Sequence, residues 1–343
     1  MTSIIKRAAL TPTVTGTLLA ILNYGPPRLR DPIMLFLQKN LSATNIRRLR
    51  TTLKWLFAIG IGQTLNRALD DLSLNNWNPT NQAVWNWSQE IAVVTGGSNG
   101  IGALVCDRLA AKGVKVVILD VVEPQKDISN NSGLIFKKCD ITDPEAVKAV
   151  AEEIRRTVGK PSILINNAGI AHGHTILETS PEYLKKLFNV NFLSHYYTLQ
   201  AFLPDMIAAK KGHVLATASM ASFVSVAGLV DYCGTKSAVL SLHEGLAQEL
   251  RHRYHAPQVR TSVIHPTWCR TTLIASYEDA LAKAGEVVIT PEEVADAIAK
   301  QIFSGRSGQI ILGGSLGFLS GLRGWPTWVQ EFLRNGSNKS VMQ

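Results

Sequence analysis

The sequence has few cysteines and no cysteine pair with the spacing of a metal site. Its four cysteines are scattered over 343 residues, and no two of them form a Cys-x-x-Cys motif. Neither a disulfide framework nor a structural zinc site is therefore indicated, and we expect reduced thiols in a reducing compartment. The sequence also has no internal repeat and no low-complexity tract. Its length and its 46% apolar residues allow a buried core in one large domain or in two ordinary ones.

A convincing transmembrane segment is also lacking. The apolar stretch 8–22 is shorter than the ~20 residues that a helix needs to cross a bilayer, and it is rich in Thr, Gly and Pro. It has no clear small-residue cleavage site, which argues against a removed signal peptide. We therefore expect any membrane contact of this region to be monotopic, with the chain lying on the surface.

Excess positive charge is scarce outside the N-terminal region. Residues 1–89 contain ten Lys and Arg against three Asp, a net charge of +7, and the remainder carries only +2. Since the basic region also contains apolar stretches, it fits an anionic membrane surface better than nucleic acid. We expect this extension to lie on the cytosolic face of the endoplasmic reticulum or of a lipid droplet. The alternative is that it packs on the catalytic domain or on a second subunit, and the protein is then cytoplasmic.

From residue 90 onward, short apolar runs rich in β-branched residues alternate with longer amphipathic stretches. This alternation predicts βαβ units and an α/β fold, a Rossmann-type doubly wound parallel sheet of seven strands with flanking helices. The predicted strands are 91–95, 114–119, 134–138, 162–166, 213–218, 259–264 and 309–313. We divide the chain into a membrane-associating or docking extension with its linker (1–89), a catalytic domain (90–315) and a C-terminal tail (316–343).

The first predicted strand leads into TGGSNGIG, residues 95–102, which a helical pattern follows. A glycine turn between a strand and a helix lets the backbone approach a pyrophosphate and directs the helix N-terminus toward it. Gly96, Gly100 and Gly102 are the glycines that this turn requires. The second strand ends in Asp120, whose carboxylate can accept hydrogen bonds from an adenosine ribose and would repel a 2′-phosphate. We therefore predict a dinucleotide site that prefers NAD to NADP.

Further motifs follow in order: Asp140 in CDITD, the run Asn166 to Gly169, Asn191 in NVNF, Ser219, and Tyr232-x-x-x-Lys236. With the glycine turn, they resemble the short-chain dehydrogenase/reductase family over about residues 90–315, and most closely its membrane-associated, retinol-dehydrogenase-like branch. The resemblance implies cofactor binding by Thr95, Gly96, Ser98, Asn99, Gly100, Ile101, Gly102, Asp120, Asp140, Ile141, Asn167, Ala168, Gly169, Tyr232, Lys236, Pro266 and Thr271. One departure is Thr267, where the family usually has a glycine after Pro266.

Tyr232 and Lys236 are four residues apart, so on a helix their side chains share a face and can point into one cleft. A tyrosine with its ordinary pKa of about 10 is a poor base at neutral pH, and a nearby ammonium favours the phenolate. We therefore expect Lys236 to lower the pKa of Tyr232 toward the range of a useful general acid/base. The resemblance further implies that Lys236 holds the nicotinamide ribose, that Ser219 orients the substrate oxygen, and that Asn191 fixes a water in a proton relay.

These features predict an NAD-dependent oxidoreductase that interconverts an alcohol and a carbonyl on a lipophilic substrate of retinoid, steroid or long-chain type. We expect residues 219–229 and a lid at 268–286 to line the substrate site. The tail offers Trp325 and Trp328 either for a membrane interface or for closing the pocket. The resemblance also implies a second copy of the chain as a partner, because family members commonly pair through the helices that contain Asn191 and Tyr232.

Two alternatives stay open at this point. One is an NADPH-dependent ketoreductase of secondary metabolism, against which Asp120 argues. The other is a dinucleotide-binding sensor or scaffold without turnover, against which the complete set Asn191, Ser219, Tyr232 and Lys236 argues. A metal site is not expected, because His172 and His174 are spaced like a ligand pair but no further ligand set accompanies them.

Overall fold

The computed structural model describes residues 9–78, 83–125, 133–283 and 285–337. The chain divides into two compact units between Trp77 and Asn78. The domain limits that we predict from the sequence, 1–89, 90–315 and 316–343, follow composition rather than packing, and they remain predictions.

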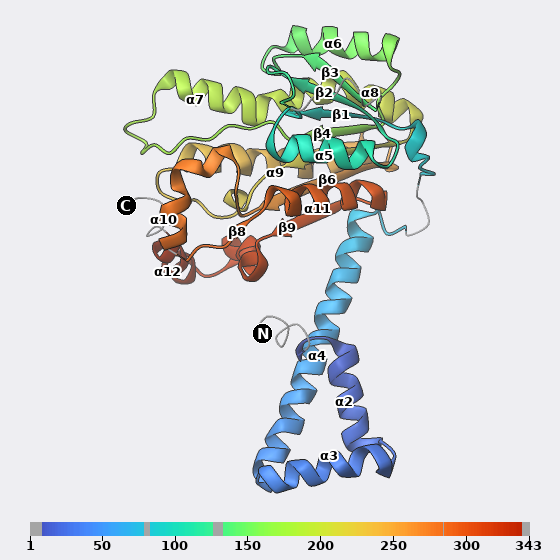
Figure 1. Ribbon diagram of the computed structural model, residues 1–343, viewed down its shortest axis with the longest axis vertical. Helices are drawn as coiled ribbons and strands as arrows, with labels where there is room; N and C mark the ends of the chain where they lie inside the picture. The colour runs from blue at the N-terminus through green and yellow to red at the C-terminus, as the bar shows by residue number, and fades with distance from the viewer. Residues whose placement is uncertain (1–8, 79–82, 126–132, 284, 338–343) are drawn as a thin grey trace. The chain divides into compact units, whose positions relative to one another are not determined.

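Three helices make up the described part of the N-terminal unit (Figure 1): α2 (Pro12–Tyr24), α3 (Pro27–Asn40) and α4 (Ala43–Leu74). A proline stands in the first turn of α2 and of α3, and the Ser42 hydroxyl accepts the amide of Asn45 at the start of α4, at 3.3 Å. Glycine brings α2 close to α4, since a Cβ at Gly16 would lie 2.7 Å from the Phe57 ring. No helix within the described ranges combines the length and the apolar character that crossing a membrane requires.

This unit buries little of its own apolar surface. Within its described residues, Leu22 and Ile46 are the only large hydrophobic side chains that are nearly fully buried. Leu35, Phe36 and Trp55 each expose about two thirds of their surface. Exposed apolar groups at this density are typical of a surface that contacts a partner or a membrane.

The second unit is built on a seven-stranded parallel sheet (Figure 1) with the order β3-β2-β1-β4-β5-β6-β9. Its strands are β1 (Ile91–Thr95), β2 (Lys115–Asp120), β3 (Leu134–Lys138), β4 (Ile163–Asn166), β5 (Gly212–Thr217), β6 (Val259–Pro266) and β9 (Gly308–Leu312). All seven predicted strands are present, and their ends differ from the predictions by at most two residues. The predicted fold class is confirmed.

Helices cover both faces of this sheet. On one face lie α6 (Pro144–Thr157), α8 (Ser194–Ala209) and α9 (Val230–His252), and on the other lie α5 (Gly100–Ala110) and α11 (Pro291–Ser304). Successive strand residues point to opposite faces, so Val93 packs in the first core and Val94 in the second. The hydroxyl of Thr290 caps α11 by accepting the Glu293 amide at 3.2 Å, and Pro291 opens the helix.

The strand order changes direction between β1 and β4, which is where open sheets of this kind bind ligands beyond their carboxyl ends. A short second sheet lies after β6 and pairs β7 (Trp268–Cys269) with β8 (Val288–Ile289). Between these strands, η4 (Thr272–Tyr277) and α10 (Glu278–Lys283) occupy the predicted lid region. After β9, the chain forms η5 (Gly314–Gly324) and α12 (Thr327–Ser337). The loops that follow the strands therefore lie at this ligand-binding edge of the sheet. The segments after β6 and β9 extend these loops with β7, β8 and η5.

Candidate active site

The glycine turn after β1 leaves open space at the start of α5. Gly96 and Gly100 have φ angles of +64° and +54°, in the left-handed region that favours glycine. A Cβ at Gly102 would lie 2.0 Å from the carbonyl oxygen of Gly96, so the helix can pack on the turn only without a side chain there. A Cβ at Gly100, by contrast, would meet no atom within 4 Å. The turn is thus packed tightly on its inner side and open where a phosphate would approach the helix N-terminus.

The carboxylate of Asp120 is held at the edge of the same opening. Its two oxygens accept the backbone amides of Ser98 and Val122, at 3.1 and 3.2 Å. The Ser98 hydroxyl donates to the Val122 carbonyl at 2.6 Å, which fastens the turn to the end of β2. The ends of β1 and β2 therefore act together to fix a negative charge beside the glycine turn.

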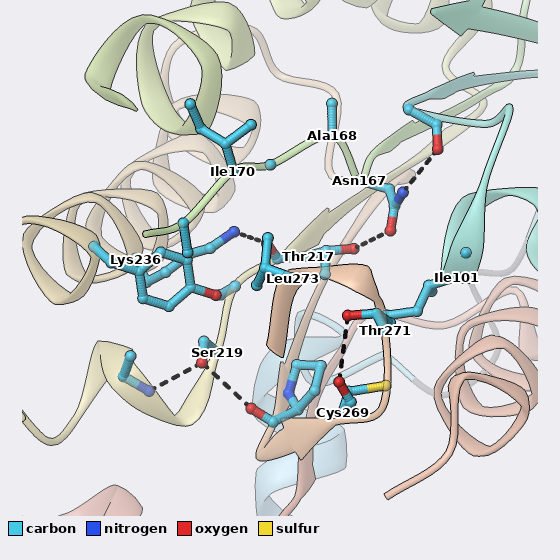
Figure 2. A pocket seen from close by; sticks show the side chains of 18 of the residues that line it. Ile101, Asn167, Ala168, Ile170, Thr217, Ser219, Lys236, Cys269, Thr271 and Leu273 are labelled. Atoms are coloured by element: carbon cyan, nitrogen blue, oxygen red, sulfur yellow. Dashed lines mark hydrogen bonds between the residues drawn. The ribbon is translucent and has the colours of Figure 1, made fainter. Parts of the chain in front are cut away.

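Thr95 fastens the β4 loop to the end of β1. Its hydroxyl oxygen accepts the amides of Asn167 and Ala168, at 3.0 and 3.1 Å. The Asn167 side chain in turn donates to the Gly96 carbonyl at 3.3 Å and accepts the Thr217 hydroxyl at 3.4 Å (Figure 2). Thr95 itself is buried, so its contribution to the site is to hold the residues that line it.

Asn191 lies in η2 (Asn189–Leu193), a π-helical turn between α7 (Pro181–Phe188) and α8. Its amide side chain donates to the Ile170 carbonyl and accepts the Ile170 amide, both at 2.8 Å. It also donates to the Thr235 hydroxyl on α9 at 3.3 Å. A Cβ at Gly169 would lie 3.6 Å from both the Asn191 oxygen and the Lys236 amine, so the β4 loop passes between these two groups. Insertions of this kind in a helix are frequent at functional sites.

Tyr232 and Lys236 lie on α9, as predicted, and on the same side of it. The Lys236 amine donates to the Thr217 carbonyl at the end of β5, at 2.8 Å (Figure 2), and lies 5.6 Å from the centroid of the Tyr232 ring. Lys236 is almost completely buried, at 3% exposure, and this burial lowers the pKa of its amine to about 8. The backbone of α9 is fixed by the Ser222 hydroxyl, which donates to the Lys236 carbonyl at 2.8 Å.

The prediction that Lys236 lowers the pKa of Tyr232 is wrong for the protein without a bound cofactor. Burial raises the pKa of the Tyr232 phenol to about 12, and a hydrogen bond with Ser219 acts in the opposite direction. The amine lies over the ring, and the cost of removing water from the phenolate outweighs the attraction of its charge. Ser219 is therefore the residue that favours the phenolate most clearly in this structure.

The loop after β6 accommodates Thr267 without strain. Thr267 is not among the residues with a positive φ angle, so this position does not require glycine, and its amide donates to the Leu312 carbonyl at 2.8 Å. Pro266 accepts the Ser219 hydroxyl at 3.4 Å, and the Thr271 hydroxyl donates to the Cys269 carbonyl at 3.3 Å (Figure 2). This position therefore accepts Thr267 in place of the family's glycine, and its amide pairs with the end of β9.

One cavity of about 870 Å³ connects these groups. Of the predicted site residues, those that line it are Gly96, Asn99, Gly100, Ile101, Asp120, Asp140, Ile141, Asn167, Ala168, Gly169, Ser219, Tyr232, Lys236, Pro266 and Thr271. Thr95, Ser98, Gly102 and Asn191 lie behind this lining, where they are buried. Asp140 keeps its place through its own carboxylate, which accepts the amide and the hydroxyl of Thr142.

Another part of the cavity lining is made of apolar side chains, and we call it the apolar end. Its lining there includes Val224, Val226 and Leu229, from the segment predicted to line the substrate site, and Leu273 and Ile274 from the lid region.

His172 and His174 stack on each other with ring centroids 4.4 Å apart. Within the described ranges, no group of three or more His, Cys, Asp or Glu could hold a metal ion.

The sequence analysis missed His265, which supports Ser219 from behind. A ring nitrogen of His265 lies 3.0 Å from the Ser219 carbonyl, and its other ring nitrogen lies 3.4 Å from the Gln309 amide on β9. Burial lowers the pKa of His265 to about 4, so the ring is neutral at physiological pH. The only sequence signal was a histidine at the end of a buried strand, which by itself does not indicate this contact.

Comparisons with known proteins agree with this geometry. A family model described as short chain dehydrogenase matches residues 90–282, and the chain belongs to that family. Dehydrogenase RED2 of Cochliobolus heterostrophus is 42% identical over 209 residues, which cover 61% of this chain and 78% of the relative. The ligand-free aldohexose dehydrogenase of Thermoplasma acidophilum matches with a TM-score of 0.58 and 25% identity, over 67% of this chain and 94% of that structure.

Two further relatives are named for lipophilic alcohols. Epidermal retinol dehydrogenase 2 of Mus musculus is 31% identical and is aligned over 63% of this chain and 73% of its own length. Estradiol 17-beta-dehydrogenase 11 of Pongo abelii is 30% identical, over 68% of this chain and 78% of its own length. The protein is therefore a short-chain oxidoreductase that acts on alcohol groups and binds a nicotinamide dinucleotide, and it has retinol-dehydrogenase-like relatives.

The chain's own residues fit such a cofactor. The open space over Gly100 lies at a helix N-terminus, and the Asp120 carboxylate borders the same cavity, where it can accept hydrogen bonds from a ribose. The Lys236 amine and Thr271 line the same cavity. Most of the predicted binding residues therefore share one cavity with Tyr232, and Thr95, Ser98 and Gly102 support its lining from behind.

The burial of Lys236 makes a prediction about stability. Below about pH 8 the amine is charged in the folded and in the unfolded protein, so the cost of burying the charge lowers the stability in full. Between about pH 8 and 10.5 the folded amine is neutral and the unfolded amine keeps its proton, so stability rises with pH. Relative to a Lys236→Met variant, the free energy of unfolding of the parent should rise by about 3 kcal/mol across this window.

Urea denaturation of both proteins at several pH values measures this difference. The comparison with Lys236→Met cancels the contributions of other groups that titrate in the same range, such as the buried cysteines. A difference that stays constant from neutral to alkaline pH would show that the amine is not buried as described.

Proposed function

We propose that the protein is an NAD-dependent oxidoreductase that interconverts an alcohol and a carbonyl on a lipophilic substrate, with Tyr232 as the general acid/base. The observation that carries this proposal is that Tyr232 and Ser219 line the same cavity as the glycine turn and the apolar end. The reacting carbon of the substrate must contact the cofactor and the proton-transfer group at the same time, and the residues proposed for both tasks line this one cavity.

The roles follow from the contacts. When bound, the nicotinamide dinucleotide supplies the hydride acceptor or donor and, in its oxidised form, a positive charge. The Tyr232 oxygen takes the proton of the alcohol, or returns it to the carbonyl oxygen in reverse. Ser219 donates a hydrogen bond that orients the substrate oxygen, and the Lys236 ammonium stabilises the phenolate. Asn191 bonds Ile170 in the β4 loop and Thr235 on α9, the residue before Lys236, which supports its proposed place in a proton relay.

Loss of the phenol should separate turnover from cofactor binding. We expect a Tyr232→Phe variant to lose at least about 100-fold in kcat with a lipophilic secondary alcohol, because a positioned acid/base contributes roughly that much or more. Its Kd for NADH, measured by fluorescence titration, should change by less than about threefold. Tyr196→Phe, which alters an exposed tyrosine on α8, serves as the matched control. Full activity of Tyr232→Phe would contradict the mechanism and would favour a reaction without this proton shuttle.

The choice of NAD over NADP rests on Asp120. Its carboxylate is fixed at the cavity by two backbone amides, so it cannot turn away easily from a 2′-phosphate. The lysines that line the described cavity are Lys186 of α7 and Lys236 of α9, no arginine lines it, and the glycine turn itself contains neither residue type. This arrangement argues against the alternative of an NADPH-dependent ketoreductase.

We expect the parent to bind NADH more tightly than NADPH, and an Asp120→Asn variant to narrow the ratio of the two Kd values at least tenfold. The amide keeps the size of the carboxylate but removes the charge that repels the phosphate. Glu123→Gln, an exposed acid a few residues farther along, is the control and should leave the ratio unchanged. Calorimetric titration with both cofactors gives the ratios. Equal affinities in the parent would overturn the assignment.

A lipophilic substrate is supported by the apolar end of the cavity. Valine, leucine and isoleucine side chains from residues 219–229 and from the lid line it, and a polar substrate would leave its own groups unpaired there. Retinol and estradiol, for which two of the relatives are named, are alcohols on large apolar molecules. We therefore propose a retinoid, a steroid or a long-chain alcohol. The scaffold alternative has less support, because Asn191 and Lys236 both lie beside Gly169, and Ser219 and Lys236 both contact Tyr232.

Attachment to a membrane surface is the proposed role of the N-terminal unit. Its helices expose apolar side chains and carry most of the net positive charge of the chain, which suits an anionic lipid surface. The cytosolic face of the endoplasmic reticulum or a lipid droplet is the proposed location. A homodimer formed through the helical segment that contains Asn191 (η2) and through α9, which contains Tyr232, remains a proposal that derives from the family.

Replacing exposed apolar residues of this unit should release the protein from vesicles. We expect a Phe36→Asp, Trp55→Asp double variant to bind vesicles of phosphatidylcholine and phosphatidylserine at least tenfold more weakly than the parent in a flotation assay. Leu177→Asp is the control, since Leu177 is 97% exposed in the catalytic unit. Equal recovery of the parent and the double variant with the vesicles would exclude this surface as the anchor.

A further inference from the structure

The cavity has a third apolar wall, which lies beyond the region that the family model matches. Leu316 and Leu319 of η5 line the same cavity as Tyr232, although the family match ends at residue 282. We call residues 314–324, which form η5, the C-terminal wall. Its position means that a segment of the tail contacts whatever occupies the apolar end of the cavity.

Arg323 fastens the C-terminal wall to the elements that carry the proposed catalytic residues. Its guanidinium donates to the Ser237 hydroxyl at 2.9 Å and to the Phe223 carbonyl at 3.4 Å. Ser237 is the residue after Lys236, and its hydroxyl donates to the Ser222 carbonyl at 3.1 Å. One side chain thus ties the wall to α9 and to the loop that follows Ser219.

Contacts within the tail hold the wall in its shape. The rings of Phe318 and Trp325 stack with centroids 5.8 Å apart, and Leu322 is fully buried. From α12, the Gln330 side chain donates to the Trp325 carbonyl at 2.8 Å. The wall is therefore a fixed surface of this unit, and its two cavity-facing leucines have defined positions.

We propose that the C-terminal wall determines substrate specificity: Leu316 and Leu319 set how long an apolar group the cavity accepts, and Arg323 holds them in place. This deepens the proposed function and rests on it for the identity of the ligand as a lipophilic alcohol. Three segments enclose the apolar end, namely 219–229, the lid and this wall. The C-terminal wall lies wholly beyond residue 282, where the family match ends. We therefore expect its residues to account for differences in substrate choice between this chain and its relatives.

The experiment compares the full chain with three variants against 2-alkanols of increasing chain length. Leu319→Trp should shift the preferred length to shorter alcohols, and Leu316→Ala should shift it to longer ones. Each methylene that no longer fits should cost about fourfold in affinity. Phe332→Trp is the matched control, because Phe332 lies on α12, is 74% exposed and does not line the cavity.

Binding and turnover are both measured, so that a failure of this proposal differs from a failure of the proposed function. Binding is followed by displacement of 1-anilinonaphthalene-8-sulfonate by each alcohol, and turnover by NADH production. If the preferred chain length shifts in the binding assay but no alcohol is oxidised, the proposed role of the C-terminal wall is supported and the proposed activity is wrong. If Leu319→Trp and Leu316→Ala keep the length profile of the parent, or if the parent binds none of the alcohols, the wall has no such role.

Arg323 is tested by its own pair of variants. Arg323→Gln should raise KM for the longest alcohols at least about fivefold, with kcat for the shortest alcohol and the Kd for NADH unchanged. Arg323→Lys, which can still donate to Ser237, should recover most of the loss. A uniform fall in activity with all alcohols and weaker NADH binding in Arg323→Gln would mean that Arg323 acts on general stability, and would overturn its assignment as a positioning residue.

Discussion

The burial of an amine beside a phenol on one helix is the constraint on which the rest of the site depends. Lys236 is held by the Thr217 carbonyl at the end of β5, and the backbone of α9 is held by Ser222 and by the contact of Asn191 with Thr235. These bonds come from three separate elements, so α9 can present Tyr232 only when the sheet, the π-helical turn and the loop after β5 are all in place. The site is therefore a product of the whole sheet and cannot be attributed to the Tyr-x-x-x-Lys motif alone.

The same burial explains why both groups depart from their ordinary pKa values. Water is excluded from the phenol and the amine, which disfavours the charged form of each. The pKa of Tyr232 is therefore raised and the pKa of Lys236 is lowered. Catalysis at neutral pH then needs groups that restore the phenolate: the Ser219 hydrogen bond, the Lys236 charge, and the positive charge of an oxidised nicotinamide. In the proposed mechanism, proton transfer by Tyr232 is therefore linked to cofactor binding, because the bound cofactor adds the charge that completes the activation of the phenol.

Much of the fold could be predicted from the sequence because its signals are local. Runs of β-branched residues predicted the seven strands, and a spacing of four residues predicted the shared face of Tyr232 and Lys236. What could not be predicted depends on contacts between distant parts of the chain. His265 behind Ser219, the two-residue strands β7 and β8, and the C-terminal wall have no periodicity of their own, and the direction of the Tyr232 pKa depends on burial that no spacing reveals.

The central claim is that Tyr232 becomes ionisable at accessible pH only when the oxidised cofactor adds its charge to the site. A spectroscopic titration of tyrosinate in the parent, with Tyr232→Phe subtracted, measures this directly with and without NAD. Without NAD, the difference should show no ionisation below the ordinary tyrosine pKa of about 10. With NAD it should show one phenol that ionises below that value, and an unchanged difference spectrum on NAD binding would contradict the account.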